Sequence, residues 1–358
     1  MVPLLQFIIC RRHGNDANEV SVTHNSKLIN ANFKLYNYFI NNNGGKTFEW
    51  QIIEKAQEYK LLPDMVECPM NLASCKVVCK IARVVDRVQW VCEGCGRRQP
   101  IRVGSFFFRL QCTILQTLQM ILAWCEDADC EVVAEHFGVK SKIARQIYDR
   151  LDELVVNELK KTQLGGENSV VLAEMYPDCL NRLSPDTTDQ PHVHRILMLA
   201  DTNHIPTYYR LHVIKEDPKK GNLSNDCEIL RAQLEEIVAQ AVTPNSMLVT
   251  GNSLPVVDGS SSIQQLLQQC DVDMKHFLTS RIWRQGLTLC AASRDLCAGA
   301  TSAQNQLCAS SVQRYLDTAT YRLRFGDGFY SHVISLIAER YTERCVANVA
   351  VAAEGCNV

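Results

Sequence analysis

The chain has 358 residues, of which 21% are charged and 46% hydrophobic, and its formal net charge is −2. This length is sufficient for two or three domains with a large core, and the composition excludes a wholly disordered chain. The charge excludes a uniformly basic protein, so any affinity for nucleic acid must come from a local patch.

Cysteine usage and the absence of a targeting pattern indicate the compartment. The chain contains seventeen cysteines. Met1–Cys10 is apolar but short, and Arg11 and Arg12 follow it, which is not the order of a secretory signal. No apolar run approaches the roughly 20 residues that span a bilayer, so no membrane association is expected. We expect an intracellular, reducing compartment, where clustered cysteines indicate metal and scattered ones are buried small hydrophobes.

In chain order, the breaker run Asn41–Gly45 closes a leader, and Phe48–Leu62 has the apolar spacing of a short helix. A compact cysteine-containing segment follows, and then two helical stretches over 111–125 and 129–160. The predicted parts are a leader (1–45), a short helix with a zinc-ribbon-like segment (46–110), a helical region (111–163), a strand-rich domain (164–342) and a tail (343–358).

From residue 169 the sequence changes to apolar, β-prone stretches between polar loops. Strands are predicted over 169–174, 195–201, 207–214 and 247–250, with the amphipathic helix Cys227–Ala241 before the last of them. This strand–strand–strand–helix–strand order predicts a mixed α/β sheet. Further helices are predicted over 310–319 and 329–341.

The most specific local motif is Cys92-Glu93-Gly94-Cys95, a CxxC knuckle that directs two thiolates at one ion. A ribbon needs two further thiolates upstream, but Asn71 stands where the second cysteine of a close pair would fall. Either Cys75 with Cys79 or Cys68 with Cys75 has to complete the site. We therefore expect structural zinc on four of these five cysteines. The alternative is a degraded upstream half, with thiols that are merely buried.

The same segment is strongly basic in a chain of nearly neutral charge. Between Lys76 and Arg109 the two acidic residues are outnumbered by eight basic ones: Lys76, Lys80, Arg83, Arg87, Arg97, Arg98, Arg102 and Arg109. Such a patch is suited to phosphate contacts, and Arg97, Arg98 and Arg102 are the candidate DNA-binding residues. The alternative is an ordinary solvated face.

Residues 131–150 have the spacing of a helix-turn-helix. Gly138 stands where a tight turn requires a positive φ, Val139 is the buried turn residue, and Ser141 is expected to be the N-cap of the second helix. That helix would present basic and amide side chains to the phosphates and major groove of DNA. These candidate contacts are Lys140, Lys142, Arg145 and Gln146. The alternative is an ordinary helical hairpin, since Asp149, Asp152 and Glu153 make the far end acidic.

In the strand-rich region, carboxylates near strand ends are the candidates for catalysis. Glu174, Asp178, Asp201 and Asp258 are available, and Asp201 is the strongest because it ends an apolar strand. A lone aspartate at a strand end is also a common turn-forming residue, and this alternative stays open.

Several of these segments, in this order, resemble the Merlin-type (ISXO-like) family of DDE transposases. They are CEGCGRRQPIRVGSFFFRL and LQTLQMILAW within 91–124, AEHFGVKSKIARQIYDR at 134–150, LGG at 164–166, VVLAE at 170–174, and VQRYLDTATYRLRFGDGFYSHVISLIAERY at 312–341. The resemblance covers residues 68–342. It implies a ribbon and a helix-turn-helix that bind transposon ends. It also implies an α/β RNase H-like domain that cuts and rejoins DNA with three carboxylates and Mg²⁺.

The departures from this family concern the metal-binding carboxylates. Ala173 stands at the first position, Gly251 at the second and Gln306 at the third, while Glu174 is retained beside the first. Two-metal catalysis requires anionic ligands, and alanine and glycine provide none. Glu174 and Asp201 are the residual candidates, and Mg²⁺ is expected only if catalysis is retained.

The leading hypothesis is a transposase-derived, catalytically inactive, nuclear or otherwise intracellular protein that binds double-stranded DNA. The alternatives are a protein-interaction scaffold without DNA binding, an active Mg²⁺-dependent transposase or nuclease, and a transposon remnant without function. A homodimer is compatible with any of them.

Overall fold

The computed structural model describes residues 31–42, 44–176, 194–214, 223–251, 254, 257–297 and 305–340. The chain divides into two compact units, the first made of Met1–Leu154 with Phe325–Val358 and the second of Val155–Arg324. Two helices, α6 (Ser141–Lys160) and α12 (Asn305–Phe325), run across the boundaries between them. This division differs from the predicted boundaries after 163 and 342, because residues 325–340 belong with the first unit.

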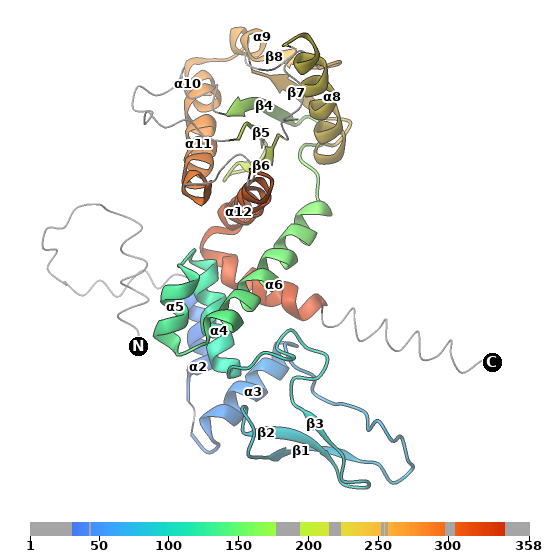
Figure 1. The fold of residues 1–358 in the computed structure, drawn as a ribbon. Helices are drawn as coiled ribbons and strands as arrows, with labels where there is room; N and C mark the ends of the chain where they lie inside the picture. The colour runs from blue at the N-terminus through green and yellow to red at the C-terminus, as the bar shows by residue number, and fades with distance from the viewer. Residues whose placement is uncertain are drawn as a thin grey trace, which may run out of the picture. The chain divides into compact units, whose positions relative to one another are not determined.

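The first unit contains a small antiparallel sheet and a group of helices (Figure 1). The strands are β1 (Val77–Ile81), β2 (Val88–Cys92) and β3 (Arg98–Pro100), paired in that order. The helices are α2 (Ala31–Ile40), α3 (Phe48–Glu58), α4 (Ile114–Cys125), α5 (Cys130–Phe137), the first part of α6, the short 3₁₀ helix η4 (Gly326–Gly328) and a helix over 329–340. The helical region is therefore confirmed, with α4 ending two residues before Asp127, whose φ is 58°.

The helix over 329–340 packs into the first unit through its apolar face. Phe329 and Tyr330 are fully buried. The Phe329 ring lies 5.4 Å from the ring of Trp124 in α4, and the backbone N–H of Tyr330 donates to Asn32 Oδ1 in α2 at 2.8 Å. A helix was predicted here, but its partners in α2 and α4 explain why it leaves the sheet domain.

The second unit is built on a five-stranded mixed sheet in the order β6-β5-β4-β7-β8. Its strands are β4 (Val170–Tyr176), β5 (Ile196–Asp201), β6 (Tyr208–Val213), β7 (Met247–Thr250) and β8 (Ser261–Ser262). The pairs β4–β5 and β5–β6 are antiparallel, whereas β7 is parallel to both β4 and β8. Helix α8 (Leu223–Ala241) lies between β6 and β7 in the chain. The predicted element order and the mixed α/β sheet are confirmed.

Helices cover both faces of this sheet (Figure 1). Successive strand residues point to opposite faces. Ala173 and Leu199 therefore pack on the α8 face, and Leu172 and Met198 pack on the face covered by α11 and α12. The further helical segments are α9 (Ile263–Gln268), α10 (Val272–His276), η1 (Phe277–Arg281), α11 (Ile282–Ala292) and η2 (Arg294–Cys297).

The free edge of β6 is closed by a side chain of α12. Gln313 accepts a hydrogen bond from the backbone N–H of Val213 and donates one to the carbonyl of Leu211, both at 2.8 Å. An amide that mimics a neighbouring strand protects an edge from pairing with another chain. One turn later, Asp317 accepts from Gln313 at 3.0 Å, and burial raises the pKa of Asp317 to about 6, although Arg210 and Lys160 oppose the shift.

Asp317→Asn is expected to stabilise the protein at neutral pH. The pKa of Asp317 in the fold, about 6, exceeds its ordinary value of 3.8, so the ionised carboxylate costs stability above pH 6. The cost shrinks as the pH falls through this window and is small at about pH 4, where the folded carboxyl is protonated and the unfolded one, with its pKa of 3.8, is about half protonated. The variant should therefore gain about 2 kcal/mol of unfolding free energy at about pH 7.5 and almost nothing at about pH 4.

Urea unfolding of the wild type and the variant at the two pH values measures this difference. The exposed Asp327→Asn is the matched control and should show no such pH dependence. If Asp317→Asn gains the same unfolding free energy at both pH values, or loses unfolding free energy near pH 7.5, the buried carboxylate does not destabilise the fold as expected.

Candidate metal centre and nucleic-acid interface

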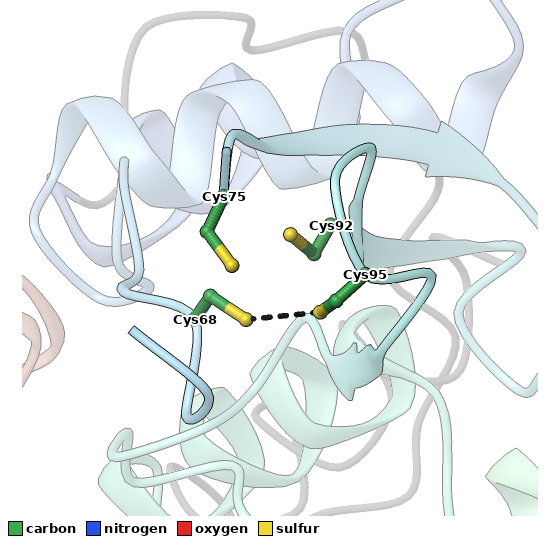
Figure 2. Close-up of side chains that lie close together, drawn as sticks. All are labelled: Cys68, Cys75, Cys92 and Cys95. Carbon is green, nitrogen blue, oxygen red and sulfur yellow. Dashed lines mark hydrogen bonds between the residues drawn. The ribbon is translucent and has the colours of Figure 1, made fainter. Parts of the chain in front are cut away.

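Four cysteine side chains of the first unit converge on one point (Figure 2). The sulfurs of Cys68, Cys75, Cys92 and Cys95 all lie within 4.8 Å of one another, and those of Cys68 and Cys95 are 3.3 Å apart. A tetrahedral ion with metal–sulfur distances of about 2.3 Å separates its sulfurs by about 3.8 Å. The cluster therefore has the size of a four-thiolate metal site.

The upstream half of the cluster is made by two successive turns. The N–H of Asn71 donates to the carbonyl of Cys68 at 2.9 Å with Asn71 in the left-handed region (φ 44°), and the N–H of Cys75 donates to the carbonyl of Leu72 at 2.8 Å. Asparagine tolerates this backbone conformation better than most residues. Cys75 thus supplies the second upstream thiol, in place of the cysteine that a close pair would have at position 71.

The downstream half is the expected knuckle between β2 and β3. The N–H of Gly96, at φ 73°, donates to the carbonyl of Cys92 at 2.8 Å, and Glu93 N–H donates to the carbonyl of Lys76 at the same distance. Gly94 has its own requirement, because a Cβ there would overlap the carbonyl oxygen of Ser74. The knuckle and the upstream turns are therefore packed directly against each other.

The electrostatic environment favours a thiolate at one corner of the cluster. The backbone N–H of Cys95 donates to the sulfur of Cys92 and lowers the pKa of Cys92 to about 6, with a smaller contribution from Gly94 N–H. Burial raises the pKa of Cys75 to about 12. Burial therefore opposes ionisation of Cys75 without a cation, whereas a bound divalent ion deprotonates its thiol ligands.

Of the five predicted ligands, Cys79 lies outside the cluster. It is in β1, opposite Trp90 of β2, and burial raises its pKa to about 11. The four remaining thiols surround the centre and leave no position for a substrate or water. Closed sets of this kind are typical of structural metal sites rather than catalytic ones.

The basic residues of the ribbon are mostly solvent-exposed, as expected for an interface. Arg97 and Arg98 are exposed, and so are the others of the basic set apart from Arg102. Lys80 pairs with Glu93 at 3.1 Å. On the outer face of the sheet, the pairing register places Arg98 opposite Val91 and Lys80 opposite Gln89, in two successive rows.

Arg102, however, is not available to DNA, and its prediction as a phosphate contact is wrong. It is buried and forms a bidentate ion pair with Asp86, whose side chain is 9% exposed, with Nε to Oδ2 at 2.5 Å. Its remaining N–H groups donate to the carbonyls of Leu110 at 2.9 Å and Cys112 at 2.6 Å. The guanidinium thus links the β1–β2 hairpin to the segment before α4 and has no N–H group left for a phosphate.

Residues 130–160 form α5, a turn and α6, an order that a helix-turn-helix and an ordinary helical hairpin share. Gly138 closes α5 in the left-handed region (φ 64°), Val139 is buried, and Ile143, Ala144 and Ile147 form the buried face of α6. Ser141 is the first helical residue rather than the N-cap, because α6 begins one residue earlier than expected. The geometry of the turn is therefore as predicted, and only the start of α6 differs.

The candidate DNA contacts on α6 differ in their availability. Lys140 and Lys142 are exposed, and Gln146 is half-buried. Arg145 is exposed, but its Nε pairs with Glu131 Oε1 of α5 at 2.7 Å. The hydrogen bonds from Arg145 and Ser141 lower the pKa of Glu131. An exposed pair of this kind is weak, so a phosphate can compete for Arg145.

Among the residues that the structure describes, the strand ends of the second unit do not bring together three carboxylates at the positions that the family resemblance implies. Ala173 pairs with Thr250 in the parallel β4–β7 ladder, so the side chain of Glu174, not that of residue 173, shares a face with position 251. A Cβ on Gly251 would overlap the carboxylate of buried Glu174. Glu174 therefore occupies the space that a metal-binding side chain at position 251 would need.

Two of the other carboxylates considered, Asp201 and Asp258, are engaged elsewhere. Asp201 is buried and accepts from Gly165 N–H at 2.7 Å, Ser169 Oγ at 2.8 Å and Asn203 N–H at 2.9 Å, so it is the turn-forming aspartate of the alternative interpretation. Asp258 is 92% exposed and pairs with Arg231 at 2.8 Å. Gln306 lies in the first turn of α12, with a side chain outside the described residues, as is the whole of Asp178.

Comparisons with protein-family models, with curated proteins and with solved structures gave no match for this chain. In the described parts of the chain, none of the helices is both long and apolar enough to cross a membrane. The geometry of the sites therefore carries the functional argument.

Arg102→Met is expected to destabilise the first unit by about 3–5 kcal/mol, because it leaves the buried Asp86 carboxylate without its partner. Arg98→Met, at an exposed position of the same ribbon, is the matched control and should change stability by less than about 0.5 kcal/mol. Urea unfolding followed by tryptophan fluorescence measures both. Equal effects of the two substitutions would show that Arg102 is an ordinary surface cation.

Proposed function

We propose that the protein is a transposase-derived DNA-binding or regulatory protein, nuclear or otherwise intracellular, that has lost strand-transfer catalysis. In this proposal a zinc-stabilised ribbon and the helix of Lys142 contact duplex DNA together. The observation that carries it is the convergence of the four thiols in a ribbon whose exposed residues are basic, followed in the chain by a helix-turn-helix.

Zinc is the metal that best suits the four-thiol cluster. Zn²⁺ prefers tetrahedral sites of soft thiolate ligands, has no redox chemistry, and commonly holds two knuckles in one small domain. The four cysteines of the cluster are free, as thiolate ligands of a metal must be.

The sheet of the second unit supports an RNase H-like assignment. Three sequential antiparallel strands are followed by α8 and by a strand parallel to the first, as in the order predicted from the sequence. Loss of catalysis is supported by the position of Glu174, whose carboxylate lies against Gly251 with no acidic side chain at 173 or 251 to share a metal. Two-metal chemistry needs several such ligands, so Mg²⁺ has no part in the proposed function.

A protein-interaction scaffold is the second candidate function. It is favoured by the acidic residues of α6 beyond its first two turns, where Asp149 and Glu153 are exposed, and by the pairing of Arg145 with Glu131. An active Mg²⁺-dependent transposase requires carboxylates that converge, which Asp201 and Asp258 do not. Salt-dependent binding to duplex DNA distinguishes the leading proposal from the scaffold, and the lack of Mg²⁺-dependent nicking distinguishes it from the active transposase.

Removal of the metal is expected to unfold the ribbon. Structural zinc contributes roughly 10–16 kcal/mol to a small domain, which exceeds what the three short strands can supply. A strong chelator should therefore abolish the ribbon's thermal transition, and added Zn²⁺ should restore it. Cys75→Ser should lose bound zinc without any chelator, whereas the matched control Cys79→Ser should keep it.

Elemental analysis of purified protein and thermal melting followed by circular dichroism measure these effects. Full zinc content in Cys75→Ser, or wild-type protein that carries no metal and melts identically with and without chelator, would contradict the proposed centre.

Binding to duplex DNA is expected at low salt and should weaken as the salt concentration rises, because phosphate contacts release counterions. The double substitution Lys142→Ala with Arg145→Ala should remove about two units from the slope of log K against log salt. Lys161→Ala, an exposed lysine paired with Glu158 after the end of α6, is the matched control and should leave the slope unchanged.

Fluorescence anisotropy with a labelled duplex over a salt series measures the slope. No binding at low salt, or an unchanged slope in the double variant, would refute the DNA-binding role and favour the scaffold.

A further inference from the structure

The first unit carries a groove that neither the thiol cluster nor the helix-turn-helix uses. It has a volume of about 440 Å³ and lies between the tip of the β1–β2 hairpin and the segment from β3 to α4. Val84 and Val85 line it on the hairpin side, and Pro100 and Phe108 line it on the other. Arg98 and Arg109 also border it. This volume is within the range of pockets that hold small organic groups.

The groove has a fixed floor. The hairpin is closed by hydrogen bonds from Ala82 N–H to the Arg87 carbonyl at 2.8 Å and from Arg87 N–H to the Val84 carbonyl at 3.0 Å. Beneath it, the buried Arg102–Asp86 pair joins the hairpin to the carbonyl of Leu110 on the opposite wall. Since the two walls are tied by a buried ion pair and its hydrogen bonds, the groove is preformed rather than a gap between loose loops.

The chemistry of the walls combines exposed apolar surface with cations. Val84 and Val85 keep 42% and 58% of their surface exposed. Arg98 and Arg109 are exposed, and the Arg109 guanidinium lies 5.3 Å from the centre of the Phe108 ring. Single-stranded nucleic acid binds where its bases stack on aromatic side chains and its phosphates meet cations, and Phe108 with Arg98 and Arg109 offers this combination beside the two valines.

We propose that this groove binds an unpaired nucleobase of a DNA strand, with the neighbouring phosphates on Arg98 and Arg109. The inference rests on the proposed DNA-binding function and deepens it by naming a DNA structure. A paired base inside a duplex cannot enter, because its faces are covered by stacking. The protein therefore prefers DNA that offers an unpaired end, overhang or junction beside a duplex.

The positive charge around the groove favours a nucleobase with its phosphates over other ligands. Seven exposed basic side chains of the ribbon are opposed by one exposed acidic side chain, Glu93. The apolar walls provide what a base requires and a free phosphate does not. A neutral apolar peptide would gain nothing from the two arginines.

The test uses the intact protein and two fluorescent probes: a blunt duplex and the same duplex with a short thymidine overhang. Wild-type protein is expected to bind the overhang probe about tenfold more tightly, which is the contribution of one stacked base. Val85→Ser and Arg109→Gln should abolish this preference while binding to the blunt duplex persists.

Two matched controls separate the groove from the general surface. Ile81→Ser changes an apolar residue of β1 that is 74% exposed and outside the groove, and it should keep the preference. Arg83→Gln changes an exposed cation of the hairpin that does not line the groove, and it should weaken both probes equally. Thermal melting of each variant verifies that the ribbon is intact.

The outcomes are distinct for the two proposals. Equal binding of the two probes by wild-type protein, or a preference that survives both groove substitutions, overturns the groove proposal and leaves duplex binding in place. Failure to bind either probe at low salt overturns the DNA-binding function itself. In a competition experiment, poly-glutamate and oligothymidine are each added to the complex with the overhang probe. If poly-glutamate displaces the probe as effectively as oligothymidine, the groove binds acidic peptides and the proposal is overturned.

Discussion

The convergence of four thiols is the constraint on which the first unit depends. The ribbon consists of three short strands and long turns, and only one face of its central strand, with Val88, Trp90 and Cys92, is buried. A segment of this size cannot bury enough apolar surface to fold alone, so metals or disulfides usually stabilise it. Here Cys68 and Cys75 from the loop before β1 meet Cys92 and Cys95 from the knuckle after β2. A metal at their centre would fix the loops that carry the exposed arginines, the groove and the approach to α4.

Under the proposed function, the second unit has lost a catalytic arrangement and kept its sheet. Asp201 stabilises the turn around Gly165 and Ser169, and Glu174 lies against the backbone of Gly251. Restoring a side chain at position 251 would force the Glu174 carboxylate to move. In the proposed history the space of the former metal site has been filled by a retained acidic residue, and the hydrophobic layers under α8 and α11 keep the sheet intact.

The sequence predicted the elements whose signals are local. The strands 196–201 and 247–250 are apolar and β-prone, Gly138 marks the turn before α6, and Cys92-Glu93-Gly94-Cys95 marks the knuckle. It could not identify partners distant in the chain. The role of Arg102 depends on Asp86 and on three carbonyls that only the fold brings together.

For the same reason, the sequence could not predict which thiols join the cluster or which residue of β4 shares a face with Gly251. Whether Cys75 joins Cys68 depends on two consecutive turns around Asn71, and a single sequence does not specify both. Alternation along β4 separates Ala173 from Glu174, but only the register with β7 shows which of them shares a face with Gly251. The helix over 329–340 was recognisable from its period, whereas its attachment to Trp124 and Asn32 was not.

The most direct test of the central claim is the coordination sphere itself. Protein reconstituted with Co²⁺ should give the intense thiolate-to-metal and visible bands of a tetrahedral four-sulfur site, because Co²⁺ enters such sites isomorphously with Zn²⁺. Substitution of any one of Cys68, Cys75, Cys92 or Cys95 should weaken these bands, and substitution of Cys79 should not. A spectrum of octahedral oxygen and nitrogen ligation, or an unchanged four-sulfur spectrum after loss of Cys75, would contradict the account.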